Sequence, residues 1–261
     1  KIKGFKFKKI GKSFNSFYKE HIPFSLTSSQ KKVMKEIRRD LSKGIQMNRL
    51  LQGDVGSGKT IIALLSSLIA IDNDFQSTIV APTEILAQQH YNSFKSLLIK
   101  TNINCSLLTG SSTKKERSEI KTNLKNGSLN ILIGTHAVLE GNVEFKNLGI
   151  AIIDEQHRFG VAQRSKLWLK NNLPPHILVM TATPIPRTLA MTIYGDLDVS
   201  IINKLPPGRI PVKTYHRYEN KRLQVFKFIK NQIDENKQVY IVYPLIEESS
   251  KLDYKDLMDG Y

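Results

Sequence analysis

The sequence predicts an α/β fold, in which a mostly parallel β-sheet is flanked by helices on both faces. Over most of the chain, short apolar runs alternate with longer stretches that have helical spacing. The apolar runs are nearly continuous, which is typical of strands buried on both faces. Strand–helix alternation of this kind favours a parallel sheet covered by helices. A hydrophobic content of 40% is enough to form its core.

The predicted strands are six apolar runs, at residues 49–52, 78–81, 104–108, 130–133, 150–153 and 177–180. Helices are predicted between most of them, at residues 60–71, 84–99, 114–125 and 163–170. A further helix precedes the first strand. Thr27 or Ser28 supplies its N-cap, apolar residues follow at helical spacing, and Gly44 is expected to end it.

Positive charge is concentrated near the beginning of the chain. The 261 residues carry 39 Lys and Arg against 23 Asp and Glu, a formal charge of +16, and the first 50 residues hold 14 of the bases and 3 of the acids. Residues 1–23 are therefore predicted to form an extended basic leader from an upstream domain. Two interpretations stay open, namely an arm that contacts phosphates and a solvated, partly disordered segment.

The composition excludes several classes of protein. The single cysteine, Cys105, rules out a disulfide framework and a multi-cysteine zinc site, and its apolar neighbours predict a small buried residue. The sequence has no apolar signal core and no run of about 18 apolar residues, so a cytoplasmic protein without membrane attachment is expected. Because the chain begins at Lys1, we expect it to be a fragment of a longer protein.

The proline-rich residues 205–211 are the clearest predicted linker. They separate a first lobe, residues 24–204, from residues 212–261, which are expected to be the truncated start of a second lobe. Within this last segment an extended run (212–216), a helix (223–234) and a strand (238–243) are predicted. A single β-α-β piece buries too little apolar surface to fold alone.

A phosphate-binding loop is the most specific motif. The pattern G-x-x-x-x-G-K-[ST] is matched in full, between an apolar strand and a helix, by Gly53, Asp54, Val55, Gly56, Ser57, Gly58, Lys59 and Thr60. The glycines let backbone N–H groups surround phosphate oxygens, and the helix N-terminus adds partial positive charge. Lys59 is expected to reach the outer phosphates and Thr60 to ligate Mg²⁺. The motif predicts nucleotide binding.

An acidic pair, Asp154 and Glu155, follows the apolar run 150–153. A lone pair at a strand end is usually a solvated turn, but after a phosphate loop it predicts catalysis. Asp154 would hold the metal through water, and Glu155 would orient and deprotonate the attacking water. His157 alone is more often a structural or surface residue. Beside the acidic pair it is a candidate link between the nucleotide site and whatever binds outside.

Longer strings resemble a known family. The phosphate loop, the acidic pair with His157, and Thr181-Ala182-Thr183 resemble the motor of superfamily 2 helicases. More specifically, the chain resembles the bacterial RecG family of ATP-dependent DNA helicases from residue 24 to residue 261, through residues 50–60, 154–161, 181–190, 205–209 and 244–249. One small departure is Gln46, where the family commonly has proline. The resemblance implies a RecA-like P-loop NTPase lobe that uses ATP and Mg²⁺.

The resemblance also implies roles for individual residues. Adenine binding is implied for Phe24 and Gln30, with an ordinary N-cap and a core phenylalanine as the alternative. Contact with DNA is implied for Thr83, Glu84, Thr135 and His136, which without the resemblance would be plain helix caps and their neighbours. Coupling of the nucleotide site to the DNA side is implied for Gln156, His157, Thr181, Thr183 and Arg187. An exposed arginine is the alternative at position 187.

The implied activity is ATP-dependent translocation on DNA by a monomer, which remodels branched DNA such as stalled forks and Holliday junctions in recombination and repair. The family's motor needs a second lobe that supplies arginine fingers, so this lobe alone is expected to turn over little or no ATP. A nucleotide- and DNA-binding module without turnover is therefore one alternative. The motor lobe of a transcription-repair coupling factor, whose partner is RNA polymerase, is a second, and a primosomal helicase is a third. The coupling factor usually has Glu-Glu-Gln where this chain has Glu155, Gln156 and His157, which favours RecG.

Overall fold

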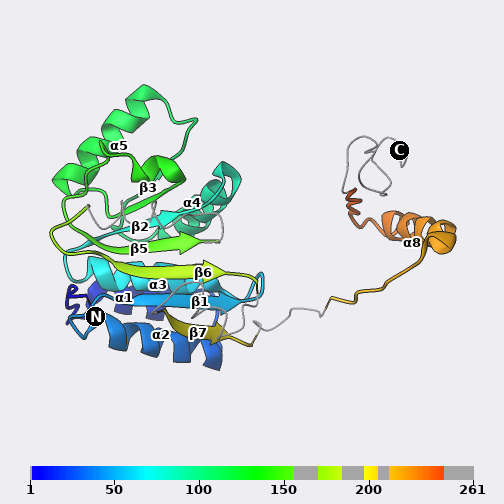
Figure 1. The fold of residues 1–261 in the computed structure, drawn as a ribbon, viewed down its shortest axis with the longest axis horizontal. Helices are drawn as coiled ribbons and strands as arrows, with labels where there is room; N and C mark the ends of the chain where they lie inside the picture. Colours follow the sequence, from blue (N-terminus) through cyan, green and yellow to red (C-terminus); the bar gives the residue numbers. More distant parts are fainter. Residues whose placement is uncertain (1, 156–169, 184–196, 205–211, 244–261) are drawn as a thin grey trace. The chain divides into compact units, whose positions relative to one another are not determined.

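The computed structural model describes residues 2–155, 170–183, 197–204 and 212–243 (Figure 1). The chain divides into two units, Lys1–Arg209 and Ile210–Tyr261. The first unit holds the β-sheet, and the described residues of the second, 212–243, hold one α-helix with its flanking segments.

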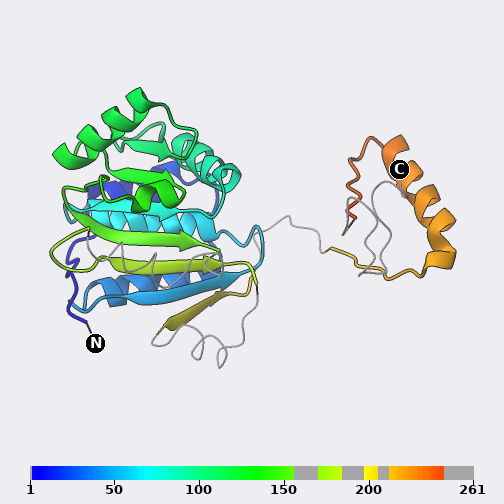
Figure 2. The ribbon, with the colours of Figure 1, turned by 45° about the horizontal axis from the view of Figure 1, so that its top comes forward.

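The first unit is built on a seven-stranded sheet in which every pair of neighbouring strands is parallel. The strand order is β3-β4-β2-β5-β6-β1-β7, and the arrowheads point to the same side in Figures 1 and 2. The strands are β1 (Asn48–Gly53), β2 (Gln76–Val80), β3 (Cys105–Leu108), β4 (Ile131–Gly134), β5 (Leu148–Asp154), β6 (His176–Thr181) and β7 (Asp198–Ile202). The predicted parallel α/β fold and all six predicted strands are confirmed.

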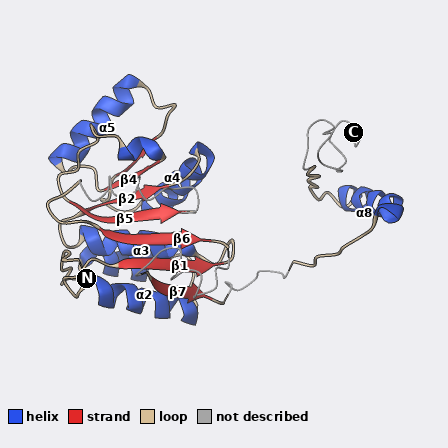
Figure 3. Cartoon of the chain, viewed as in Figure 1, coloured by secondary structure: helices blue, strands red, loops and turns tan. Residues whose placement is uncertain are grey.

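Helices cover the two faces of this sheet (Figure 3). Among the described residues of the first unit, the longer helices are α2 (Ser28–Leu41), α3 (Lys59–Ile71), α4 (Glu84–Leu98) and α5 (Lys114–Asn126). Apolar residues of α2, α3 and α4 belong to the core on one face, and those of α5 and of the short helix η2 (His136–Leu139) to the core on the other. Successive strand residues alternate between the two cores, as Leu50 and Leu51 do, which is why the strands are apolar throughout.

The strand β7, at the edge of the sheet beside β1, was not predicted from the sequence. Only some of its residues are buried, because it lies at the edge of the sheet. The strand therefore lacks the continuous apolar run by which the other strands were predicted. Polar contacts help to hold it: Arg49 Nη1 donates to Ser200 Oγ at 2.8 Å, and Ser29 Oγ donates to Asn203 Oδ1 at 3.0 Å. These partners are far apart in the sequence, so local patterning does not reveal them.

The N-cap of helix α2 is Thr27, one of the two residues predicted for it, and the structure adds a capping box with Gln30. Thr27 Oγ1 accepts a hydrogen bond from Gln30 N at 3.2 Å, and Gln30 Oε1 accepts one from Thr27 N at 2.8 Å. The helix ends at Leu41, so the predicted end at Gly44 was too late. Gly44 instead adopts a left-handed conformation, with φ of 73°, beyond the helix.

Residues 2–22 pack against the sheet domain, and the prediction of an extended leader is wrong for this part of it. Phe7 and Phe17 are buried in the core, and the segment contains α1 (Lys12–Ser16) and the π-helical turn η1 (Phe17–His21). The Asp72 carboxylate accepts backbone N–H groups at the start of α1, including Ser13 N at 2.9 Å. It therefore satisfies donors that a helix start leaves free. The connection of this segment to an upstream domain stays a prediction.

Two other expectations differ from the structure or fall outside it. Cys105 is only partly buried, where full burial was expected; burial raises the pKa of its thiol. The predicted helix at 163–170 lies almost wholly outside the described residues, as does the linker 205–211. Within the described part of the chain, no helix has both the length and the apolar character needed to span a membrane.

The second unit contains α8 (Arg222–Asp234), which confirms the predicted helix, preceded by the 3₁₀ turn η4 (Glu219–Lys221). The runs 212–216 and 238–243, predicted as extended and as a strand, form no strand among the described residues of this unit. A strand needs a hydrogen-bonded neighbour, and a single β-α-β piece does not supply a sheet. No residue of α8 is buried, so its apolar side chains, such as Leu223 and Phe228, stay exposed.

A fully buried histidine, His176, lies at the start of β6. Its Nδ1 accepts a hydrogen bond from Met47 N at 2.9 Å. Its ring packs against that of Phe7 in a T-shaped arrangement, with the two ring centroids 4.9 Å apart. Because burial disfavours the charged imidazolium, it lowers the pKa of His176 to about 4. The folded protein therefore holds this ring neutral.

We expect this histidine to make the fold sensitive to acid. The unfolded state binds the proton near pH 6.5 and the folded state only near pH 4, so the stabilisation is complete above pH 6.5 and is lost as the pH falls toward 4. The shift corresponds to a loss of about 3 kcal/mol in the free energy of unfolding across that window. Urea unfolding of wild type and His176→Gln at several pH values measures it. An equal loss in both proteins would contradict the assignment.

Candidate functional site

The phosphate loop runs from the end of β1 into the start of α3. Gly56 and Gly58 have φ of 77° and 90°, a left-handed conformation that favours glycine. A Cβ on Gly58 would also lie 2.3 Å from Gln30 Nε2, and one on Gly53 would lie 2.6 Å from Ser57 Oγ. The glycines of the motif are therefore required both by backbone conformation and by close packing.

Lys59 and Thr60 occupy the first turn of α3, where backbone N–H groups point out of the helix start. The Lys59 ammonium donates to Gly53 O at 2.6 Å and to Asp54 O at 3.1 Å, so it lies across the mouth of the loop. Thr60 is partly exposed at the same place. The structure thus brings together the groups predicted to bind phosphate and Mg²⁺.

Gln30 connects the cap of α2 to the phosphate loop. Its Oε1 closes the capping box with Thr27, while its Nε2 donates to Ser57 O at 2.8 Å, and the side chain is 1% exposed. The sequence predicted the cap but not the bond to the loop. Phe24, by contrast, is 50% exposed, so it is available to stack on a base and is not a core residue. Contact of either residue with adenine stays a prediction.

The acidic pair lies two strands away from β1, at the end of β5. Asp154 is buried, whereas Glu155 is partly exposed and adopts a left-handed conformation with φ of 50°. Such backbone strain in a residue other than glycine is common at functional sites. The Glu155 carboxylate accepts a hydrogen bond from Ala182 N at 3.0 Å, just beyond the end of β6. The predicted catalytic glutamate is therefore held by the segment predicted to couple the two sites.

Thr181 and Thr183 are themselves joined, Oγ1 to Oγ1 at 2.8 Å. Thr181 Oγ1 also makes a long contact of 3.5 Å with Glu155 Oε2. A chain of polar groups thus runs from the acidic pair into residues 181–183. The other predicted coupling residues, Gln156, His157 and Arg187, lie outside the described residues.

His90, on α4, was not singled out from the sequence. Its Nε2 lies 2.7 Å from Asp154 Oδ2, and both residues are nearly buried, at 9% and 8% exposure. A carboxylate oxygen can only accept, so the ring nitrogen donates. The two residues are 64 positions apart, and no short motif contains both.

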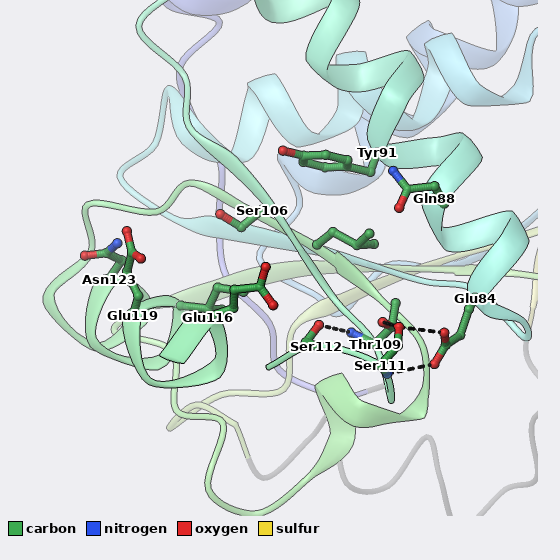
Figure 4. Close-up of a pocket in the computed structure, with 12 residues that line it drawn as sticks. Glu84, Gln88, Tyr91, Ser106, Thr109, Ser111, Ser112, Glu116, Glu119 and Asn123 are labelled. Atoms are coloured by element: carbon green, nitrogen blue, oxygen red, sulfur yellow. Dashed lines mark hydrogen bonds between the residues drawn. The ribbon is translucent and has the colours of Figure 1, made fainter. Parts of the chain in front are cut away.

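The residues predicted to contact DNA follow β2 and β4. Thr83 caps α4 by accepting Leu86 N at 3.3 Å, and the next residue, Glu84, is exposed. Glu84 accepts Ser111 N at 3.1 Å and Ser111 Oγ at 2.8 Å (Figure 4). These hydrogen bonds from Ser111 are the main reason that the pKa of Glu84 is lowered. Glu84 therefore braces the loop 109–112.

Thr135 and His136 differ from each other in exposure. His136 is exposed at the start of η2, but Thr135 is 2% exposed, and its hydroxyl is buried without a hydrogen-bond partner in the described structure. The expectation that the Thr135 hydroxyl meets a DNA phosphate is not met by its position here. The neighbouring loop 109–112 is held by Arg117, whose guanidinium donates to the carbonyl groups of Thr109 and Ser112 at 2.6 and 3.2 Å.

A groove of about 470 Å³ lies beside this loop, between α4, β3 and α5. Figure 4 shows Glu84 turned toward Ser111 at one end of the groove. Three glutamates, Glu84, Glu116 and Glu119, line it with Tyr91 and smaller polar residues. None of its lining residues belongs to the phosphate loop or to the acidic pair, so the groove is separate from the predicted nucleotide site.

Three neighbouring strands, β5, β6 and β1, thus end in an acidic pair, a threonine segment and a glycine-rich phosphate loop. These features define a P-loop NTPase of the RecA-like class. A family model described as DEAD/DEAH box helicase matches residues 27–192, and the chain belongs to this family.

Within the helicases, the similarity to RecG proteins is strong. The chain is 51% identical to the ATP-dependent DNA helicase RecG of Aquifex aeolicus over 93% of its own length and 31% of the relative's. The identity to RecG of Bacillus subtilis is 47%, over 92% and 35% of the two chains. A solved structure of RecG bound to a three-way DNA junction matches with a TM-score of 0.82 and 42% identity, over 94% of this chain and 32% of that one.

The chain therefore spans about a third of the length of the curated relatives it matches. A DEAD box protein from the hyperthermophile Methanococcus jannaschii also matches, with a TM-score of 0.57 and 22% identity, over 86% of this chain and 62% of that one. That similarity shows the shared fold.

We expect Gly58→Ala to disturb the phosphate loop. A side chain at φ of 90° costs about 1–2 kcal/mol, and its Cβ would meet Gln30 Nε2 and weaken the bond to Ser57 O. Urea unfolding should show this loss. Gly141→Ala is the matched control, because a Cβ there meets no atom within 4 Å, and it should leave stability unchanged. Equal stability of the two variants would contradict the role of Gly58.

Proposed function

We propose that this chain is the ATP-binding lobe of a RecG-type DNA helicase, which uses ATP to move along DNA and to remodel branched DNA in recombination and repair. The observation that carries the proposal is the joint placement of the phosphate loop, the acidic pair and residues 181–183 at one edge of the sheet. The similarity to RecG proteins over nine-tenths of the chain supports it. The cytoplasm, where chromosomal DNA of bacteria lies, is the corresponding location.

Lys59, Asp154 and Glu155 form the proposed hydrolytic group. The ammonium of Lys59 would leave the loop carbonyls to contact the outer phosphates, since anionic oxygens are stronger acceptors. Glu155 would orient the attacking water and accept its proton. Because Ala182 N holds the Glu155 carboxylate, a shift of residues 181–183 would change the position of this base.

A Mg²⁺ ion fits the proposed site. Thr60 and Asp154 offer hard oxygen ligands, and the described residues contain no group of three or more histidine, cysteine, aspartate or glutamate side chains suited to a metal. This is the pattern expected of Mg²⁺, which takes few protein ligands and is held largely by phosphates and water. When bound, the ion would neutralise charge on the transferred phosphoryl group.

The DNA side of the lobe would be formed by the segments after β2, β3 and β4, with Thr83, the loop 109–112 and His136. Backbone N–H groups at helix starts and short hydroxyl side chains are common partners of DNA phosphates. The solved RecG structure that matches this chain holds a three-way DNA junction. Branched DNA is therefore the proposed substrate, and a monomer is the proposed working unit.

Substitutions in the hydrolytic group test the nucleotide site. In the full-length protein, Glu155→Gln should lower DNA-stimulated ATP turnover about 10²–10⁴-fold while nucleotide still binds. Lys59→Ala should weaken both binding and turnover, because it removes charge from the phosphates. Turnover and binding of a fluorescent ATP analogue measure the two effects. The control is Lys125→Ala, an exposed lysine paired with Glu144 on the surface. Near wild-type turnover in either site variant would overturn the assignment.

A second experiment tests the substrate. The full-length protein should unwind a three-way junction with ATP, and should act at least about 10-fold more slowly on a blunt linear duplex of the same length. Equal rates on both substrates would remove the preference for branched DNA. Capture of RNA polymerase, together with failure to unwind the junction, would favour the transcription-repair coupling factor instead.

A further inference from the structure

We propose that His90 is a positioning residue for the metal-binding carboxylate of Asp154. The proposal rests on the proposed nucleotide site and assigns a role to a residue outside its motifs. His90 touches neither the phosphate loop nor Glu155 in the described hydrogen bonds. It acts through its single bond to Asp154.

The geometry is that of a strong hydrogen bond. The distance of 2.7 Å between His90 Nε2 and Asp154 Oδ2 lies at the short end of the range for a nitrogen donor and a carboxylate. The bond occupies Oδ2, so Oδ1 would be the oxygen that holds the metal or its water. Carboxylates that ligate metals are commonly held by hydrogen bonds from outer partners, and loss of such a partner typically costs about 10–100-fold in metal affinity.

The place of His90 on α4 argues against an ordinary core histidine. Ala87, His90, Phe94 and Leu98 are the buried residues of this helix, so His90 occupies a position where an apolar residue would suit the core. A buried polar group destabilises a fold unless it is hydrogen-bonded. Among the described residues, its ring is hydrogen-bonded to the carboxylate that the proposed nucleotide site uses, and Phe94 and Leu98 anchor the helix in the core.

This bond also joins the nucleotide site to a particular helix. α4 begins next to Thr83, and its first residue, Glu84, holds Ser111. His90 lies about two helical turns further along, or roughly 10 Å. Asp154 is therefore tied to the same rigid element that carries the proposed DNA-facing residues at its start.

The test measures the Mg²⁺ requirement for nucleotide binding, which does not depend on turnover. Affinity for a fluorescent ADP analogue is recorded against Mg²⁺ concentration for wild type, His90→Phe and His90→Gln. His90→Phe removes the donor and should raise the half-saturating Mg²⁺ concentration about 10-fold or more. His90→Gln places an amide N–H near the position of Nε2 and should restore most of the affinity. Binding without Mg²⁺ should be similar in all three proteins.

Two further variants sharpen the experiment. His21→Phe is the matched control, because its ring nitrogen instead contacts Lys100 O, at 3.1 Å, and it should leave the Mg²⁺ requirement unchanged. In an Asp154→Asn background, His90→Phe should shift the Mg²⁺ requirement no further, since the two residues act as one unit. A further shift of similar size in that background would overturn the proposal.

The remaining outcomes decide the matter as follows. A folded His90→Phe protein with a wild-type Mg²⁺ requirement overturns the proposal. If His90→Phe does not fold, His90→Leu, which also lacks the donor, takes its place: a raised Mg²⁺ requirement that His90→Gln restores supports the positioning role, and a wild-type requirement overturns it. A wild-type chain whose nucleotide binding ignores Mg²⁺ would instead contradict the proposed site itself. The two failures are therefore distinguishable.

Discussion

The parallel alignment of all seven strands is the constraint on which the rest of the structure depends. Because every strand runs in the same direction, the segments that follow the strands emerge along one edge of the sheet. The phosphate loop, the acidic pair and residues 181–183 follow the neighbouring strands β1, β5 and β6, and the proposed DNA segments follow β2, β3 and β4. Ligand sites of open α/β sheets form at this edge for the same reason.

Polar contacts, buried or partly buried, then join the parts of this edge to one another. Gln30 joins the α2 cap to the phosphate loop, Ala182 N holds Glu155, and His90 holds Asp154. Each of these bonds joins elements that are distant in the sequence, and the bonds of Gln30 and His90 satisfy buried groups that would otherwise destabilise the interior. The phosphate loop and the acidic pair are therefore held by hydrogen bonds from residues outside their own motifs.

The net charge has a different meaning once the fold is known. The excess of lysine and arginine in the first 50 residues suggested a free arm, yet Phe7 and Phe17 of this segment are core residues. The lysines are thus displayed on a packed segment and on α2. Charge in this region is a property of the surface of the lobe, and the proposal of DNA contact stands on the segments after β2, β3 and β4.

The sequence by itself determined the six apolar strands, most of the helices, the phosphate loop and the acidic pair, because each depends on residues close together in the chain. The tertiary structure alone decided four features: the polar edge strand β7, the packing of residues 2–22, the burial of the Thr135 hydroxyl, and the bond between His90 and Asp154. The physical reason is distance in the sequence. Periodicity and short motifs report local geometry, whereas the partner of a buried polar group 64 residues away is set by strand order and by the helices that cross between strands.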